Sequence, residues 1–316
     1  MNKIDVSVVV PMYNEQTYIA ECLNSIVSQD FSSYEIILVD DGSTDNGLEI
    51  AEGILKDTEI RHKIIRQKNR GVGQARNEGI RNSSGEFIVF VDSDDWIKSN
   101  HLKCLYNSIK GNDLAFTGLA KIDENKNMIQ ESRLSAKSIS ALELIELELK
   151  MEIPFNFCQI MYRKDLIDHY FSKTVVYGED TEFAIKNIIN AETVGICNDV
   201  TYFYRQYEGS STGKASFKRF EFIQILENLQ DNFNEYPELV ELTRKNRIPK
   251  AIFGNLMYFV YNDYNTDEVL EEMKRLDLFT KLGEFEGDSK FKFKSRLFLL
   301  NPKIYIKMWK KFKNSI

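Results

Sequence analysis

Three apolar runs in the first hundred residues each end in a cluster of polar or acidic side chains, and this pattern limits the fold more than any other feature. A shorter apolar run lies between the second and the third, and segments with helical periodicity separate them. The strands are predicted at 6–10, 35–39, 60–65 and 87–91, and the helices at 16–28, 46–56 and 73–82. Strands that alternate with helices of this length predict βαβ units and a parallel sheet.

The polar clusters all fall where a predicted strand ends. Tyr13-Asn14-Glu15 follows the first strand, Asp40-Asp41 the second, and Asp92–Asp95 the last. Ligands of such sheets bind beyond the carboxyl ends of the strands. We therefore expect the three clusters to line one crevice.

The last cluster places the carboxylates of Asp92, Asp94 and Asp95 within four positions. Like charges so close repel one another unless a positive charge lies between them. Mg²⁺ and similar hard cations are held by one or two carboxylates together with substrate phosphates. The cluster therefore predicts a metal–phosphate site. The alternative is that Asp94 and Asp95 cap a helix that begins near Trp96.

The sequence lacks the usual phosphate-binding loops. No glycine-rich fingerprint follows the first predicted strand, and no Gly-x-x-x-x-Gly-Lys-Ser/Thr motif is present. A bound phosphate would therefore need a metal and basic side chains to neutralise it. The basic stretch 68–70 and Arg76 are the candidates.

Four segments resemble, in order, the successive motifs of the family 2 inverting glycosyltransferases, which have the GT-A fold. These segments are VVVPMYNE at 8–15, VDDGSTD at 39–45, GVGQARNEG at 71–79 and VDSDD at 91–95. The similarity covers about residues 4–110, and a weaker similarity continues at 177–183 and 204–211. The resemblance implies an α/β fold with a Rossmann-like, mostly parallel sheet flanked by helices, and a nucleotide-sugar donor.

The resemblance also implies roles for individual residues. Tyr13 would stack on the nucleobase, with Pro11 shaping the turn beneath it, and an aromatic face suits any base. Asp41 would accept a hydrogen bond from the N3–H of uracil. Asp92 would reach the ribose or the sugar, and Asp94 would bind Mn²⁺ or Mg²⁺ across the diphosphate.

Further residues of these motifs are expected to bind substrate, namely Glu15, Ser93, Arg76 and Arg205. Arg76 would add positive charge near the phosphates. Arg205 and the segment 209–213 would close on the diphosphate. Asp92 is expected to share the metal with Asp94.

An inverting transfer needs a base that takes the proton of the acceptor hydroxyl as it attacks C1. The similarity of Gly178-Glu179-Asp180 to the acidic pair of the family implies Asp180 as this base, with Glu179 next in line. Two adjacent carboxylates in one site raise the pKa of one of them, which suits a base. Acids in the first turn of a helix are also favourable without any catalytic role.

The pattern changes after the predicted sheet. One or two strands are predicted at 113–132, with further strands at 155–162 and 194–204 and helices at 139–150 and 180–190. From residue 216 onward the periodicity predicts helices, at 216–234, 237–262 and 266–283. We therefore expect a nucleotide-sugar-binding and catalytic domain at 1–215 and a helical region at 216–316.

Composition favours an intracellular protein. Four scattered cysteines, Cys22, Cys104, Cys158 and Cys197, form no Cys-x-x-Cys pair and are expected to be free thiols in a reducing compartment. The three histidines are isolated, so no catalytic histidine is expected. The first strand begins too early for a signal peptide, and no apolar run reaches the roughly 18 residues of a membrane span. These features predict a cytoplasmic location.

The last 28 residues, 289–316, carry nine Lys or Arg and no Asp or Glu. With the whole chain at −7, removing these nine charges leaves −16 for the rest. Within this stretch the residues of one predicted helical stripe are Ile304, Tyr305, Met308, Trp309 and Phe312. Basic amphipathic helices of this kind lie on anionic membrane surfaces. The stripe could instead pack on the acidic body of the protein, including across a homo-oligomer. Nucleic-acid binding is not expected, because the basic charge is confined to one stretch.

These features predict a metal-dependent inverting transferase that moves a hexose or N-acetylhexosamine from a UDP-sugar to a glycan or lipid-linked acceptor. The predicted process is cell-surface polysaccharide synthesis at the inner face of a bacterial membrane. A nucleotidyltransferase on a similar sheet is one alternative, but it would need a glycine-rich, Arg-containing loop after the first strand. A sugar-nucleotide-binding protein without catalysis is the other, and the set Asp92, Asp94 and Asp180 argues against it.

Overall fold

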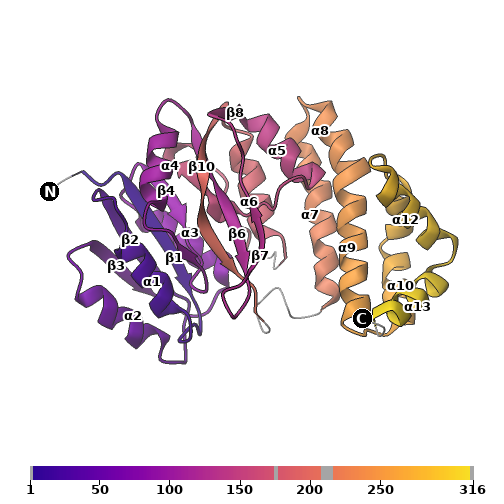
Figure 1. The fold of residues 1–316 in the computed structure, drawn as a ribbon, viewed down its shortest axis with the longest axis horizontal. Helices are drawn as coiled ribbons and strands as arrows, with labels where there is room; N and C mark the ends of the chain where they lie inside the picture. The colour runs from indigo at the N-terminus through magenta and orange to yellow at the C-terminus, as the bar shows by residue number, and fades with distance from the viewer. Residues whose placement is uncertain (1–2, 174–176, 208–215, 314–316) are drawn as a thin grey trace. The chain divides into compact units, whose positions relative to one another are not determined.

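The computed structural model describes residues 3–173, 177–207 and 216–313, which form two compact units (Figure 1). The first unit holds the described residues of Met1–Glu148, Ile153–Val175 and Glu179–Glu208. The second holds those of Leu149–Glu152, Val176–Gly178 and Gly209–Ile316. The domain boundary expected at residue 215 lies outside the described residues.

Within its described residues, the first unit is built on a ten-stranded sheet with the order β3-β2-β1-β4-β9-β6-β10-β5, to which β7 adds beside β6 and β8 beside β10. The strands are β1 (Val6–Met12), β2 (Tyr34–Asp40), β3 (Arg61–Arg66), β4 (Phe87–Phe90), β5 (Trp96–Ile97), β6 (Leu114–Ile122), β7 (Met128–Ser132), β8 (Ser138–Ser140), β9 (Ile160–Arg163) and β10 (Thr193–Arg205). The pairs from β3 to β4 are parallel, and beyond β4 the sheet is mixed.

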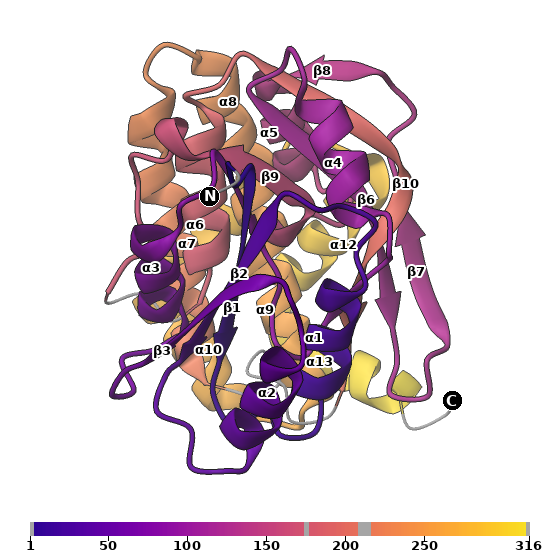
Figure 2. The same cartoon turned by 90° about the vertical axis from the view of Figure 1, so that its left-hand side faces the viewer.

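The helices of this unit are α1 (Ile19–Val27), α2 (Gly47–Lys56), α3 (Val72–Asn82), α4 (His101–Ile109), α5 (Ala141–Lys150) and α6 (Glu179–Ile188). The strand order reverses at β1, so right-handed crossovers place α1 and α2 on one face of the sheet and α3 on the other (Figure 2). Gly79 lets α3 lie close to β1, because a Cβ atom there would be 2.3 Å from Cγ1 of Val9. This close packing seats the later turns of α3 against β1.

The predicted strands and helices of the first hundred residues are confirmed, with end points shifted by up to three residues. Two expectations nearby are wrong. Trp96–Ile97 forms β5, so Asp94 and Asp95 do not cap a helix, and α4 begins only at His101. Phe157–Gln159 is a 3₁₀ turn instead of the first part of a strand, because Asn156 caps it by accepting a 2.8 Å hydrogen bond from the N–H of Cys158.

The second unit is helical, with α7 (Glu221–Leu229), α8 (Pro237–Leu242), α9 (Ile248–Tyr261), α10 (Thr266–Arg275), α11 (Leu278–Gly283), α12 (Ser289–Leu300) and α13 (Pro302–Lys313). Each of the three long predicted helices is interrupted. Asp277, in a left-handed conformation (φ 55°), separates α10 from α11. A π turn at Thr243–Arg247 separates α8 from α9, and 3₁₀ turns flank α7. None of the helices in the described residues combines the length and apolar character needed to cross a bilayer.

The expectation of four free thiols is wrong for one pair. Helix α4 packs against β10 and brings Cys104 and Cys197 to a Cα–Cα distance of 5.7 Å, where they form a disulfide. Cys22 and Cys158 are free and buried. The spacing of 93 residues between the bonded pair gives no local sequence signal, because only the packing of the helix on the sheet brings them together.

Candidate active site

The loops that leave β1 and β2 lie side by side, because these strands are parallel and in register to their last residues. The side-chain oxygen of Asn14 accepts a hydrogen bond from the N–H of Thr44 (2.8 Å), and the hydroxyl of Ser43 accepts one from the N–H of Asn14 (3.0 Å). Tyr13 beside them is 45% exposed, so its ring is accessible to a ligand. Pro11 is buried within β1.

Asp41 is buried and holds the loop between β3 and α3. One carboxylate oxygen accepts hydrogen bonds from the side-chain amide of Gln67 (2.6 Å) and the N–H of Arg70 (2.9 Å). The other accepts from the N–H of Gly71 (2.8 Å). A base bound at Asp41 would share this carboxylate with the loop, so base contact and loop geometry are coupled.

Carboxylates from the first and last predicted clusters crowd together, as the strand order requires. Burial and the charges of Asp94 and Asp45 raise the pKa of Glu15 to about 7. Burial and the charge of Asp92 raise the pKa of Asp94 to about 6. Hydrogen bonds from the hydroxyl of Tyr207 work in the opposite direction on the pKa of both carboxylates. A bound cation would stabilise such a group of acids.

Asp92 and Asp94 fit a divalent cation by their chemistry. Among the described side chains, no three His, Cys, Asp or Glu residues converge as a complete metal site. Mg²⁺, however, takes only one or two carboxylates from a protein when substrate phosphates supply other ligands. The two aspartates meet that requirement, and the pKa of Asp94 is raised by its burial and by the neighbouring charge of Asp92. Ser93 between them is buried.

The third acid of this cluster, Asp95, has a different environment. It is buried, and it accepts hydrogen bonds from the hydroxyl of Tyr202 (2.6 Å) and the N–H of Arg205 (2.8 Å). Burial and the neighbouring aspartate charges raise the pKa of Asp95 well above its usual range. Asp95 therefore connects the cluster to β10 and points to a structural role.

Arg205 contacts the acidic cluster at Asp94 and Asp95. Its Nε donates to the backbone oxygen of Asp94 (2.9 Å), and a terminal nitrogen donates to Glu21 (2.6 Å). The guanidinium carbon lies 4.5 Å from the ring centre of Tyr18 and 4.6 Å from that of Trp96. In this structure Arg205 thus fixes the backbone of the expected metal ligand.

Arg76 is also buried, and it bridges two acids that are far apart in the sequence. It donates to Asp92 at 2.8 Å and to Glu179 at 3.4 Å. Its guanidinium carbon lies over the rings of Phe157 (4.5 Å) and Phe171 (5.2 Å). Burial works to lower the pKa of Arg76, but the two carboxylates together raise it, so the side chain stays charged. Arg76 thereby connects Asp92, an expected metal ligand, to Glu179, the neighbour of the expected base.

The expected base pair begins α6. Burial and the charge of Asp180 raise the pKa of Glu179 to about 7, and burial raises the pKa of Asp180. The carboxylate of Asp180 accepts hydrogen bonds from the backbone N–H of Thr181 (2.7 Å) and from its own backbone N–H. Glu179 is held by Arg76, so Asp180 is the less engaged of the two.

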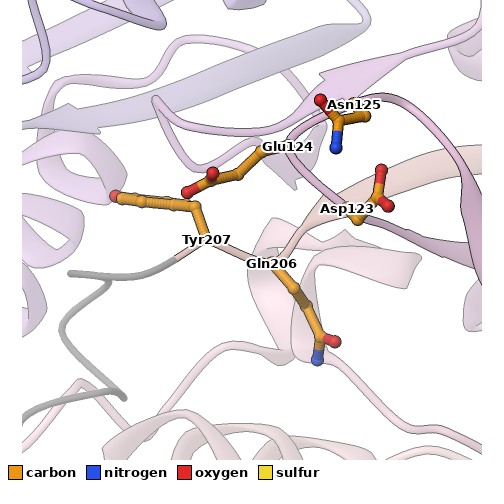
Figure 3. Close-up of a pocket in the computed structure, with 5 residues that line it drawn as sticks. All are labelled: Asp123, Glu124, Asn125, Gln206 and Tyr207. Carbon is orange, nitrogen blue, oxygen red and sulfur yellow. The ribbon is translucent and has the colours of Figure 1, made fainter.

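A shallow pocket of about 380 Å³ adjoins the acidic cluster (Figure 3). The residues that line it are Asp123, Glu124, Asn125, Gln206 and Tyr207. The side chains of Glu124 and Tyr207 extend in the same direction, and Tyr207 also bonds the carboxylates of the crevice. The predicted closing segment 209–213 lies outside the described residues.

Sequence reasoning missed the side chains that hold these acids in place. Tyr207 belongs to the weaker similarity at 204–211, and its spacing two residues after Arg205 was a usable signal. Tyr202 lies in a strand whose apolar pattern explains it without a polar role. Glu21 pairs with Arg205 across 184 positions of sequence, so no local pattern could reveal the contact.

The comparisons with known proteins agree with this geometry. The family model for glycosyl transferase family 2 matches residues 7–171, which is over half of the chain. The chain belongs to glycosyl transferase family 2. The family predicted from the four motifs is therefore confirmed.

Two curated relatives illustrate the similarity. The uncharacterized glycosyltransferase EpsJ of Bacillus subtilis is 32% identical over 216 residues, covering 66% of this chain and 62% of EpsJ. The poly(ribitol-phosphate) beta-N-acetylglucosaminyltransferase TarS of Staphylococcus aureus is 30% identical over 236 residues, covering 70% of this chain and 39% of TarS. The chain thus spans less than two thirds of the length of these relatives.

Solved structures confirm the fold class. A crystal structure of S. aureus TarS 1-349 in complex with UDP-GlcNAc has a TM-score of 0.72 at 23% identity and covers 99% of this chain and 91% of its own. The mannosyltransferase PcManGT from Pyrobaculum calidifontis, in complex with GDP-Man and Mn²⁺, has a TM-score of 0.57 at 15% identity, covering 99% of this chain and 88% of its own. At these identities the likeness concerns the fold.

Proposed function

We propose that this protein is an inverting glycosyltransferase that moves a hexose or N-acetylhexosamine from a UDP-sugar to a glycan or lipid-linked acceptor. The observation that carries the proposal is the crowding of Glu15, Asp92 and Asp94 at the carboxyl ends of parallel strands, in a chain of this family. Such a site suits a diphosphate bound through a divalent cation. It would repel a diphosphate alone.

The donor would lie across the strand ends. The accessible ring of Tyr13 supports stacking on the base, and Asp41 would accept a hydrogen bond from it. Asp94, with Asp92, would hold Mn²⁺ or Mg²⁺. When bound, the ion would stabilise the charge of the departing nucleoside diphosphate.

Asp180 would act as the general base. The acceptor oxygen forms a bond to C1 while the bond from C1 to the diphosphate oxygen breaks, and the acceptor proton passes to the Asp180 carboxylate. Burial raises the pKa of Asp180, and a higher pKa gives a carboxylate a greater affinity for the acceptor proton. Arg76 keeps Glu179 paired beside it.

Two relatives, TarS and a Bacillus spizizenii protein, are named as poly(ribitol-phosphate) glycosyltransferases. Their names support an acceptor in cell-surface polysaccharide synthesis for this chain as well. We assign catalysis to residues 1–215 and propose that the reaction takes place at the inner face of the plasma membrane. Residues 216–316 would make the contacts with the membrane or with a second copy of the chain. Because Cys104 and Cys197 form a disulfide, the expectation of four free thiols no longer supports a cytoplasmic location.

Turnover of a panel of nucleotide sugars, with Mn²⁺, with Mg²⁺ and with EDTA, tests this function. We expect metal-dependent release of UDP from one UDP-sugar, and NMR of the glycoside product should show the opposite anomeric configuration from the donor. Binding without turnover would favour the sugar-nucleotide-binding alternative. Pyrophosphate release from a nucleoside triphosphate and a sugar phosphate would favour a nucleotidyltransferase.

A further inference from the structure

Helix α12 of the second unit carries apolar side chains on two opposite faces. At about 100° per residue, Phe298 lies about 140° around the helix from Phe293. The Phe298 face is buried, and its ring packs 6.2 Å from Phe253 and 5.6 Å from Tyr305. A surface helix needs only one apolar face to pack against its own protein.

The second apolar face of α12 is exposed. Phe293, Leu297 and Leu300 follow one another at the four- and three-residue spacing of a single helical stripe. Their exposed fractions are 68%, 40% and 82%. The stripe escaped sequence analysis because α12 has apolar residues all round and shows no clear amphipathic period.

Helix α13, which follows Asn301, also exposes apolar side chains. Of the apolar stripe predicted in this helix, some side chains are buried and others are exposed. Tyr305 is buried, whereas Ile304 and Met308, four residues apart, are 57% and 51% exposed. The side chain of Phe312 lies outside the described residues. Packing therefore accounts for only part of the predicted stripe.

Basic residues border this surface. On α12, Lys290 and Arg296 lie about 60° to either side of Phe293. Lys307 lies one position before Met308 on α13. Among the described residues these three make no ion pair with an acid, while Lys303 pairs with Asp267 at 2.7 Å. The surface thus combines accessible apolar side chains with uncompensated positive charge.

We propose that the exposed faces of α12 and α13 dock this protein on an anionic lipid surface. Apolar side chains bordered by Lys and Arg match the boundary between acyl chains and negative headgroups. Each basic residue near such a surface contributes about fivefold in binding. The remainder of the chain, at −16, is repelled by the same surface, so docking would be oriented. The proposal does not depend on the glycosyltransferase reaction.

Sedimentation with vesicles of phosphatidylcholine containing phosphatidylglycerol tests the proposal. The test variant is Phe293→Ser/Leu297→Ser/Leu300→Ser in the full chain. The matched control is Met128→Ser/Ile129→Ser, which removes two side chains of β7 that are 57% and 54% exposed. All five side chains are exposed, so both variants should keep the wild-type circular dichroism.

Wild type and control should bind the anionic vesicles, and the triple variant should bind at least about a hundredfold more weakly, because each fully buried Phe or Leu is worth about tenfold or more. Salt should weaken wild-type binding as the Debye length falls from about 10 Å at 0.1 M to about 3 Å at 1 M. Wild type should bind poorly to vesicles of phosphatidylcholine alone.

Three results would overturn the proposal. Wild type and triple variant could bind the anionic vesicles equally, or wild type could fail to bind them. Light scattering without lipid could also show that the triple variant dissociates a wild-type oligomer, which would assign the surface to a second copy of this chain.

Discussion

Replacing Arg76 by Gln should reveal how much the bridge between Asp92 and Glu179 contributes to stability. The side chain of Arg76 is 6% exposed, and it is the cation that pairs with both acids. Breaking a fully buried ion pair by removing one partner costs about 3–5 kcal/mol. Asp92 and Glu179 keep 20% and 13% of their side-chain surface, so we expect about 3 kcal/mol of lost unfolding free energy.

Arg81→Gln is the matched control, because Arg81 lies on the same helix and also pairs with an acid. Its side chain is 49% exposed and its partner is Glu78, three residues away. Exposed pairs contribute about 0–1 kcal/mol. Urea unfolding of both variants, followed by circular dichroism, measures the difference.

The loss for Arg76→Gln should grow as the pH rises from 5 to 8. The folded-state pKa of Glu179 is about 7, above its usual value, so proton binding to Glu179 stabilises the fold at low pH and this contribution is lost as the pH rises through about 7. Arg76 lowers the pKa of Glu179, and removing it raises that pKa further. Two results would refute this account of the bridge. One is a loss of unfolding free energy at pH 8 that differs from that of Arg81→Gln by less than about 0.5 kcal/mol. The other is a loss that does not change with pH.

Three further substitutions test the crevice. Asp94→Asn should abolish metal-dependent donor turnover and weaken UDP binding only when Mn²⁺ or Mg²⁺ is present; an EDTA-resistant wild-type rate would contradict this. Asp180→Asn should lower kcat by about 10²- to 10⁴-fold while calorimetry shows unchanged UDP binding; a full rate would move the base to Glu179. Asp41→Asn should cost about 1–3 kcal/mol in urea unfolding, because its amide would face the backbone donor of Gly71 or of Arg70. An unchanged midpoint would show that the loop does not need this carboxylate.

The central strands β1, β2 and β4 could be predicted because they are largely apolar and buried throughout. A strand buried on both faces leaves that signature whatever its neighbours are. Element ends were less predictable where side chains decide them, as at the 3₁₀ turn capped by Asn156. The two-residue strand β5 is too short to show an alternation of apolar and polar residues in the sequence. It is a strand because it pairs with β10.

The candidate site could be predicted to the level of its acids and no further. Strand ends place Glu15, Asp92 and Asp94 together, and that follows from topology alone. The partners of those acids come from elsewhere in the chain. Arg205 reaches Glu21 on α1, and Arg76 reaches Glu179 on α6, so both contacts depend on tertiary packing. The motifs identified both arginines without revealing that they are buried in these pairs.

The charge balance of the crevice links its metal to its protons. The acids gathered there are Glu15, Asp92, Asp94, Asp95, Glu179 and Asp180. Arg76 pairs with Asp92 and Glu179, whereas the charge of Arg205 pairs with Glu21. Burial, together with repulsion between these acids, raises the pKa of Glu15 to about 7 and that of Asp94 to about 6, so these carboxyl groups are partly protonated near neutral pH. A divalent cation would displace protons from Asp94 and its neighbours. Donor binding through a metal should therefore release protons, whereas Asp180, on the far side of Arg76, keeps the raised pKa that a base needs.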